Sequence, residues 1–347
     1  MKRRLGSLDL LKLILTVIIV LHHFQLETGY IEGLNFANGK IYYGYAVEFF
    51  FIISGYVMCM QLEKVKEQSF AEYMKRKAIR LYPMVGIATL TNLLVIFLFY
   101  REMGYWWRDC TPGIWRIICS ILLIFSGGGI RDIPFGLNNP IWYLCVLLLC
   151  YIVAWIIVSL CKKNNTNPSY GFVIVCVIGV AVLQYGIDLP FLNSQSARGY
   201  ATFFLGMLLY KFYEKTKSFK LHIIASIVLV ICILMMRFDF EMFIDNQWAV
   251  FSFVLFPSTL IVFLGLDKFM SARIWNKLGE ISFEVYLWHV NGILVYMILN
   301  KKYPMLFPYT VFSMVLFVTI MFAWAFGVYN CIEKPLTRFL REKYINE

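Results

Sequence analysis

The hydrophobic positions of this chain gather in long continuous runs. Ten of these runs approach the length of a membrane-spanning helix, which needs about 20 mostly apolar residues to cross roughly 30 Å of hydrocarbon. They cover residues 8–26, 43–61, 81–100, 140–161, 170–186, 199–213, 221–236, 247–266, 281–299 and 308–331. Another run, 114–126, is shorter and contains Arg116, which favours a re-entrant or interfacial segment. The pattern predicts an all-α integral membrane protein, a bundle of about ten transmembrane helices.

The composition points to the same class of protein. Of the 347 residues, 60% are hydrophobic and 15% are charged, and the mean hydropathy is +0.69. Because a soluble domain carries about a quarter charged residues, these values exclude a water-soluble globular protein and a disordered chain. The strands of a membrane barrel alternate apolar and polar positions over about ten residues, so continuous runs favour helices.

The cations follow membrane topology, although a net charge of +11 is also typical of nucleic-acid-binding proteins. With the N-terminus placed in the cytoplasm, alternate loops on that side hold 22 of the 32 lysines and arginines, against 9 in the opposite loops. Cytoplasmic loops are enriched in these residues. We therefore expect both termini in the cytoplasm and no nucleic-acid partner. We also expect residues 1–347 to form a single membrane domain with no appended soluble domain.

Ionisable side chains inside the first hydrophobic run are candidates for function, because a charge at bilayer depth costs about 2.5–3.5 kcal/mol. At 100° per residue, Lys12 and His23 project from nearly the same helix face, about 16 Å apart along the axis. Asp9 lies one turn before Lys12 and can pair with it. The alternative is that Asp9 and Lys12 only extend their polar ends to the inner interface.

The second hydrophobic run contains a carboxylate, Glu48, next to three phenylalanines. In that setting a carboxylate must find a partner or take up a proton. The expected depth of Glu48 is close to that of His23, and a His–Glu pair is a suitable general base because the carboxylate orients the imidazole. The alternative is a structural ion pair that joins the first two helices.

A basic cluster precedes the third run, where Arg76 and Arg80 lie one helical turn apart on one face. Guanidinium groups suit phosphate recognition, because they fork onto oxygen atoms and stay charged. The alternative is a cytoplasmic anchor that binds anionic membrane lipids.

The ninth run carries Tyr286 and His289, which recur with Ser282 at helical spacing. A substrate contact and a structural histidine bonded to a neighbouring hydroxyl are both compatible with this pattern. Histidines, cysteines and acidic residues do not gather at metal-ligand spacing along the sequence, so we expect no metal. Nucleotide-binding and serine-hydrolase motifs in their structural context are also absent from the sequence.

Together these residues resemble the acyltransferase 3 family of ten-helix membrane proteins, over almost the whole chain. Lys12 and His23 match the family pattern R/K-x10-H. Glu48 stands at the acidic position of G-V-D-x-F-F-V-L-S-G-F. Arg76 and Arg80 fit the run F-x-x-R-R-x-x-R-I-x-P.

The last third of the chain extends the resemblance. Residues 278–282 and 286–289 look like the family segment L-G-x-I-S…Y-L-x-H, and residues 332–335 are similar to its final E-R/K-P. Two positions depart from the pattern. Leu147 replaces a glutamate of the middle-helix motif W-S-L-x-x-E-x-x-F-Y, and Asn291 stands where a proline is usual; both departures favour the branch of the family without the glutamate.

The resemblance implies transfer of an acyl group, usually acetyl from acetyl-CoA, to a hydroxyl of a cell-surface glycan or a lipid-linked sugar. The donor is then a substrate, and no bound cofactor is expected. In this scheme the arginines hold the CoA phosphates, and the histidine oriented by the glutamate acts as general base or carries the acyl group. The expected site residues are His23 and Glu48 for catalysis and, for substrate binding, Lys12, Arg76, Arg80, Tyr286 and His289.

A transporter or flippase of a polysaccharide or lipid precursor is the alternative, because ionisable groups also line translocation paths. Such proteins often consist of two related halves, and the sequence shows no such repeat. The family resemblance implies a multi-pass protein of the bacterial cytoplasmic membrane, surrounded by membrane lipids.

Overall fold

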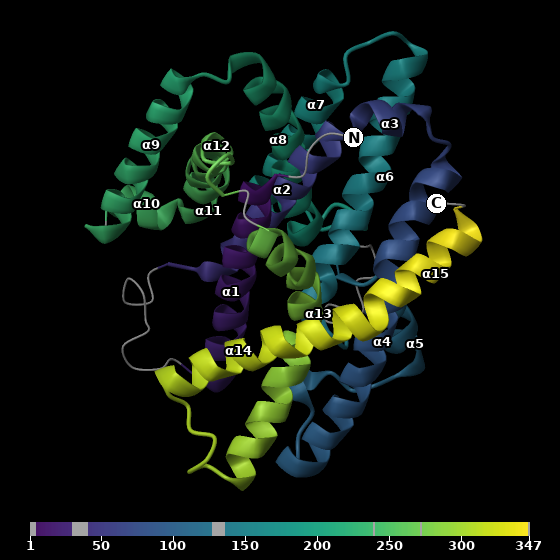
Figure 1. Cartoon of the computed structure of the whole chain (residues 1–347), viewed down its shortest axis with the longest axis vertical. Helices are drawn as coiled ribbons and strands as arrows, with labels where there is room; N and C mark the ends of the chain where they lie inside the picture. Colours follow the sequence, from purple (N-terminus) through teal and green to yellow (C-terminus); the bar gives the residue numbers. More distant parts are fainter. Residues whose placement is uncertain (1–4, 30–40, 127–135, 239, 271–272, 346–347) are drawn as a thin grey trace.

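The computed structural model of the chain describes residues 5–29, 41–126, 136–238, 240–270 and 273–345 (Figure 1). The regular structure over these residues is helical, with no named strand. The α-helices are α1 Gly6–Thr28, α2 Ala46–Met60, α3 Leu62–Glu67, α4 Phe70–Met103, α5 Ile114–Leu122, α6 Trp142–Lys163, α7 Ser169–Tyr185, α8 Ser194–Thr216, α9 Phe219–Arg237, α10 Glu241–Asp245, α11 Gln247–Val250, α12 Phe256–Gly265, α13 Arg273–Lys302, α14 Val311–Val328 and α15 Lys334–Tyr344. Short π-helical segments, Phe251–Leu255 and Tyr329–Glu333, join α11 to α12 and α14 to α15.

The length and composition of the helices confirm the all-α membrane class. In the described part of the chain, eight helical stretches are long and apolar enough to cross a membrane. They coincide with eight of the ten predicted runs. The other two runs are helical as well: α7 is apolar but only 17 residues long, and α8 has 23 residues with a more polar composition. The run at 114–126 forms the nine-residue helix α5, and a helix of this length is too short to span a membrane.

Helix α4 begins well before the predicted third run at residue 81. Ser69 caps it: the Ser69 hydroxyl accepts from the backbone N–H of Glu72 at 3.3 Å, and the Glu72 carboxylate accepts from the backbone N–H of Ser69 at 2.9 Å. This reciprocal arrangement satisfies two backbone donors that a helix start leaves open. Arg76 and Arg80 therefore lie on a continuous helix, which also contains Pro83.

Glycines allow the central helices to approach closely. A Cβ at Gly55 of α2 would overlap the carbonyl oxygen of Phe203 on α8, and a Cβ at Gly206 would overlap that of Ile52. Small residues at such crossings let helix backbones pack against each other in membranes. The crossing of α1 and α13 is similarly tight, because a Cβ at Gly279 would lie 2.6 Å from the Cβ of Asp9.

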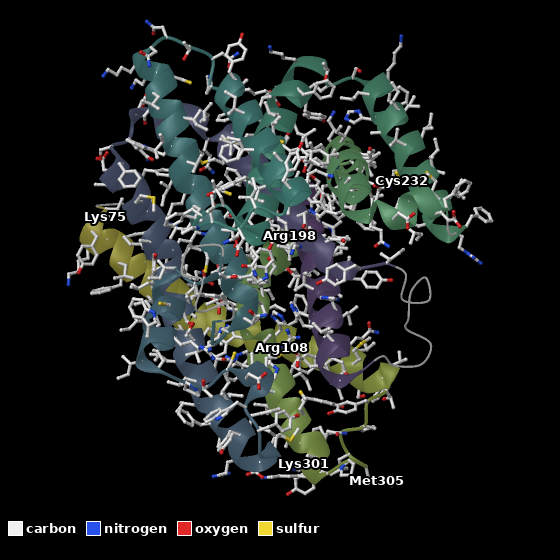
Figure 2. All side chains as sticks on the ribbon, turned by 180° about the vertical axis from the view of Figure 1, so that it is seen from behind. Lys75, Arg108, Arg198, Cys232, Lys301 and Met305 are labelled. Carbon is white, nitrogen blue, oxygen red and sulfur yellow. The ribbon has the colours of Figure 1, made fainter. Side chains whose placement is uncertain are left out.

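The two ends of the bundle differ in the ionisable residues that α1 and α4 carry toward them. We call the end where α1 begins the basic end, because Lys12 of α1 and the arginines Arg76 and Arg80 of α4 lie toward it. We call the opposite end, toward which α1 carries His22 and His23, the far end. Helices α14 and α15 follow one long diagonal across the bundle in Figure 1. Figure 2 shows Arg198 within the body of the molecule and Lys301 at its lower tip.

Candidate active site

Two histidines that are far apart in the sequence meet inside the bundle. His23 lies in the last turns of α1 and His289 in the middle of α13, and Nδ1 of His23 is 3.0 Å from Nε2 of His289. The His289 side chain is fully buried, whereas His23 keeps part of its surface accessible. Both residues were expected to be functional, and the packing of α1 against α13 places them in direct contact.

The hydrogen bonds of this histidine pair determine which nitrogen can act as a base. Nδ1 of His289 lies 2.6 Å from the carbonyl oxygen of Tyr286, which can only accept, so this nitrogen carries a proton. In a neutral His289, Nε2 is then an acceptor, and Nδ1 of His23 must donate to it. Among the described residues no hydrogen bond is recorded for Nε2 of His23, so its lone pair remains available there. His23 thus donates to His289, which in turn donates to the backbone carbonyl of Tyr286. This relay of hydrogen bonds fixes the tautomer of His23.

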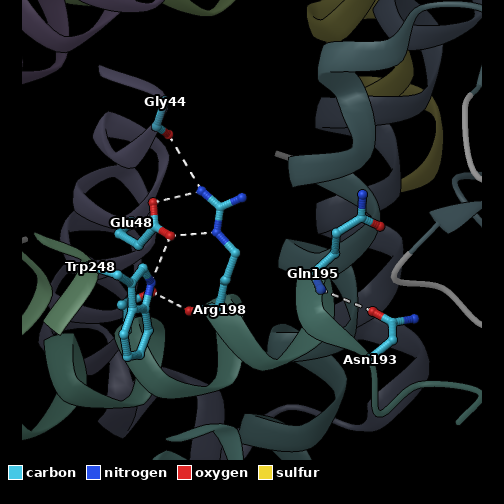
Figure 3. A network of polar contacts seen from close by, with 7 residues as sticks. Gly44, Glu48, Asn193, Gln195, Arg198 and Trp248 are labelled. Atoms are coloured by element: carbon cyan, nitrogen blue, oxygen red, sulfur yellow. Dashed lines mark hydrogen bonds and ion pairs between the residues drawn. The ribbon is translucent and has the colours of Figure 1, made fainter. Parts of the chain in front are cut away.

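Glu48 pairs with an arginine (Figure 3). Arg198 donates from Nε to Oε1 of Glu48 and from Nη2 to Oε2 at 2.9 Å, and Nε1 of Trp248 donates to Oε1 at 3.0 Å. Glu48 is completely buried, so these bonds satisfy a carboxylate that has no access to water. The structure records no hydrogen bond between His23 and Glu48 among the described residues, and in place of that expected pair it has two separate ones.

Arg198 is the site residue that sequence reasoning missed. It lies near the start of α8, which Asn193 caps by accepting from the backbone N–H groups of Gln195 and Ser196 at 3.1 Å each. Because the apolar run begins only at residue 199, Arg198 was counted among the cations of a loop. The available signal was the buried carboxylate, which needs a partner that the second helix does not supply.

A small cavity of about 60 Å³ adjoins the two pairs, and both His23 and Arg198 line it. It is large enough for at least one water-sized group. The Arg198 guanidinium carbon stands 4.9 Å from the ring centre of Trp142, another lining residue. The recorded hydrogen bonds of Arg198 use Nε and Nη2, so within the described residues Nη1 remains available to a ligand. A reacting oxygen in this cavity would lie next to both a base and a cation.

Tyr286 also lines the cavity, but its hydroxyl is already engaged. The hydroxyl donates to the carbonyl oxygen of Pro140, in the turn that leads into α6, and the ring centre is 5.8 Å from that of His289. The Tyr286 side chain therefore fixes the turn before α6 in the present arrangement, and its backbone carbonyl holds His289.

The expected donor-binding residues lie toward the other end of the bundle. Lys12 pairs with Asp9, with Nζ 3.6 Å from Oδ1. On α4, Arg80 is exposed and Arg76 is half-buried. Along the axis of α1 the distance from Lys12 to His23 is about 16 Å. The structure thus separates the predicted site into a cationic part and a histidine part. Among the described residues, no group of three or more histidine, cysteine, aspartate or glutamate side chains could hold a metal ion.

The fold and this site define a helical membrane protein with a buried histidine pair at one end and clustered cations at the other. A family model described as an acyltransferase domain matches residues 5–328, and the chain therefore belongs to the acyltransferase 3 family. It is also similar to an O-acetyl transferase of Shigella phage Sf6, with 26% identity over 180 residues. That alignment covers 49% of each chain, about half the length of the relative. No solved structure matches the chain.

The structure explains the two departures from the family pattern in physical terms. Leu147, at the position of the motif glutamate, is buried in the hydrophobic core, where a lone carboxylate would be costly. Asn291, at the position of the proline, accepts a hydrogen bond from the side chain of Asn92 and donates to the carbonyl oxygen of Ala88 at 3.3 Å. These bonds join α13 to α4 two residues after His289, and a proline could not form them.

Proposed function

We propose that the protein is an integral membrane O-acyltransferase. It moves an acyl group, acetyl in the first instance, from acyl-CoA to a hydroxyl of a cell-surface polysaccharide or a lipid-linked sugar. The family match and the similarity to a phage O-acetyl transferase support the reaction class. The observation that carries the proposal for this chain is the free Nε2 of His23 beside the small cavity, held in one tautomer by His289.

His23 is the proposed general base. Nε2 takes the proton of the acceptor hydroxyl while the hydroxyl oxygen attacks the thioester carbonyl carbon. The carbonyl oxygen then carries the negative charge of a tetrahedral intermediate, which Nη1 of Arg198, another residue that lines the cavity, stabilises. When the carbon–sulfur bond breaks, the sulfur leaves as the thiolate of CoA and takes the proton from His23. The alternative sequence, in which His23 first carries the acyl group, uses the same nitrogen.

Glu48 acts through Arg198 in this proposal. Its two oxygens hold the guanidinium over the ring of Trp142 and direct one face of the cation to the cavity. Such preorganisation increases the stabilisation of developing negative charge, since the donor need not reorient during the reaction. Glu48 is therefore a positioning residue.

The cations of the basic end are the proposed donor site. Arg76 and Arg80 would hold the phosphates of CoA. Lys12 would lie beside the acyl-bearing arm of CoA, which enters along α1 toward His23. The distribution of lysine and arginine supports a cytoplasmic position for this end, where CoA esters are found. Within this proposal all ten runs span the cytoplasmic membrane of a bacterium.

The test is release of free CoA from acetyl-CoA by the purified protein in nanodiscs, with and without a glycan acceptor. His23→Ala should reduce release at least about 100-fold, the contribution of a general base. His222→Ala is the matched control, because within the described part of the chain the His222 side chain has one recorded hydrogen bond, with the Tyr213 hydroxyl of the neighbouring helix at 3.1 Å. Unchanged release in His23→Ala would remove His23 from the reaction. If the wild-type protein released no CoA from any acyl-CoA, the transporter alternative would replace this proposal.

A further inference from the structure

A second and much larger cleft opens beside the histidine pair. Its volume is about 760 Å³, within the range of small-ligand sites in proteins. The cleft lies at the far end, between the last turns of α1, the end of α7 and the chain around α10 and α11. His22 and Tyr42 line both this cleft and the small cavity that contains His23. A ligand in the cleft would therefore lie next to the cavity that the proposed base lines.

The lining of the cleft combines aliphatic side chains with aromatic and polar ones. Amide side chains come from three separate elements: Gln25 of α1, Gln184 of α7 and the neighbours Asn246 and Gln247 at the start of α11. Each amide group both donates and accepts hydrogen bonds. A lining of this kind is unlike a lipid-facing surface, where polar groups are unfavourable. It matches a ligand that carries many hydroxyl groups.

Aromatic rings complete the lining. Tyr42 is half exposed in the cleft, and its ring is packed edge-on against His22 at 5.1 Å between centres. Its backbone N–H donates to Oε1 of Gln247 at 3.1 Å, which ties the two walls together. Trp248 lies on the other wall, fixed by its hydrogen bond to Glu48. Amphipathic rings of this type can stack on the apolar faces of sugar rings and leave the hydroxyl groups for the amides.

The charges of the cleft decide between classes of saccharide. The described lining contains one carboxylate, Asp245, and no lysine or arginine. Among the described residues, the two arginines near it are each paired with a carboxylate: Arg198 with Glu48, and Arg108 with Glu27 with 2.6 Å between Nη2 and the carboxylate. A site for an acidic glycan or a phosphate-rich polymer would present unpaired cations. This cleft presents none among its described residues.

We infer that the cleft binds a neutral, hydroxyl-rich saccharide and delivers one of its hydroxyls past His22 to the small cavity. The inference rests on the proposed function, because it identifies the acceptor site of that reaction. Gln184 and Asn246 are the specific amide contacts at its rim, where both side chains are exposed.

The experiment is binding of the full-length protein in nanodiscs to an array of neutral and acidic bacterial surface glycans. Neutral glycans should bind. The double variant Gln184→Ala with Asn246→Ala should weaken that binding about tenfold, because it removes two hydrogen-bonding amides. The matched control is Gln61→Ala with Asn164→Ala, which removes the same groups from exposed positions toward the basic end and should change nothing.

The outcomes separate this inference from the proposed function. Binding that is confined to acidic glycans, absent for every glycan, or equal in the two double variants would overturn the inference. Release of CoA that depends on His23 would in those cases leave the acyltransferase proposal intact. Conversely, His23→Ala should keep glycan binding while it loses CoA release. Neutral-glycan binding without any CoA release would preserve the saccharide site and refute the enzymatic proposal.

Discussion

Two buried polar pairs flank the small cavity, and they differ in what they leave available. In the Glu48–Arg198 pair, both carboxylate oxygens accept hydrogen bonds, and Trp248 adds a third donor. In the His23–His289 pair, the bonds recorded among the described residues engage three of the four ring nitrogens and leave Nε2 of His23. A satisfied ion pair holds helices in place, whereas a relay that ends in a free lone pair can accept a proton.

The comparison also shows why burial alone does not identify a catalytic group. Glu48 is more deeply buried than His23, and by sequence both were expected to be catalytic. Both oxygens of Glu48 already accept hydrogen bonds, however, and its proposed role is to position Arg198. His23 keeps an accessible edge at the cavity, which a reacting group needs.

The largest expected effect comes from breaking the ion pair between Glu48 and Arg198. Arg198→Met should lower the free energy of unfolding by about 3–5 kcal/mol, because Glu48 is then an uncompensated buried charge. Adding Glu48→Gln should recover most of this loss, since the amide oxygen still accepts from Trp248. Thermal unfolding in detergent measures both. Equal stability of the wild-type protein and Arg198→Met would contradict the view of Glu48 and Arg198 as a clamp between α2 and α8.

The second-largest expected effect comes from removing the hydrogen bond between His289 and His23 while His23 itself is retained. His289→Leu should reduce the kcat of CoA release about 100-fold with little change in the KM of the donor, because His23 loses the acceptor that fixes its tautomer. His289→Gln should restore a large part of the rate, since its side-chain oxygen can accept from Nδ1 of His23. A purely structural role of His289 predicts equal losses in both variants, and His222→Leu is the control for helix packing.

The smallest expected effect comes from removing two cations that lie far from both pairs. Arg76→Ala combined with Arg80→Ala should raise the apparent KM for acetyl-CoA about tenfold and leave kcat nearly unchanged, as expected for lost phosphate contacts. Steady-state kinetics with varied donor and varied acceptor provide the measurement. A change in the KM of the acceptor alone would move the donor site away from Arg76 and Arg80, and they would then be anchors to anionic lipid.

The sequence by itself determined the class of protein and the positions of the helices, because the cost of exposing polar groups to lipid imposes a length and a composition on each segment. Every predicted run is helical. For the same reason the sequence identified His23, Glu48 and His289 as groups that need an explanation inside the membrane.

Only the tertiary structure decided which of these groups are partners. Sequence position placed Glu48 beside His23, since both were expected at a similar depth on neighbouring helices. The close packing of α2 on α8 brings Arg198 to Glu48 instead, and that of α1 on α13 brings His289 to His23. Hydropathy fixes how deep a side chain lies along a helix but leaves open the rotation of the helix and its neighbours. Those are set by side-chain packing between segments far apart in the chain.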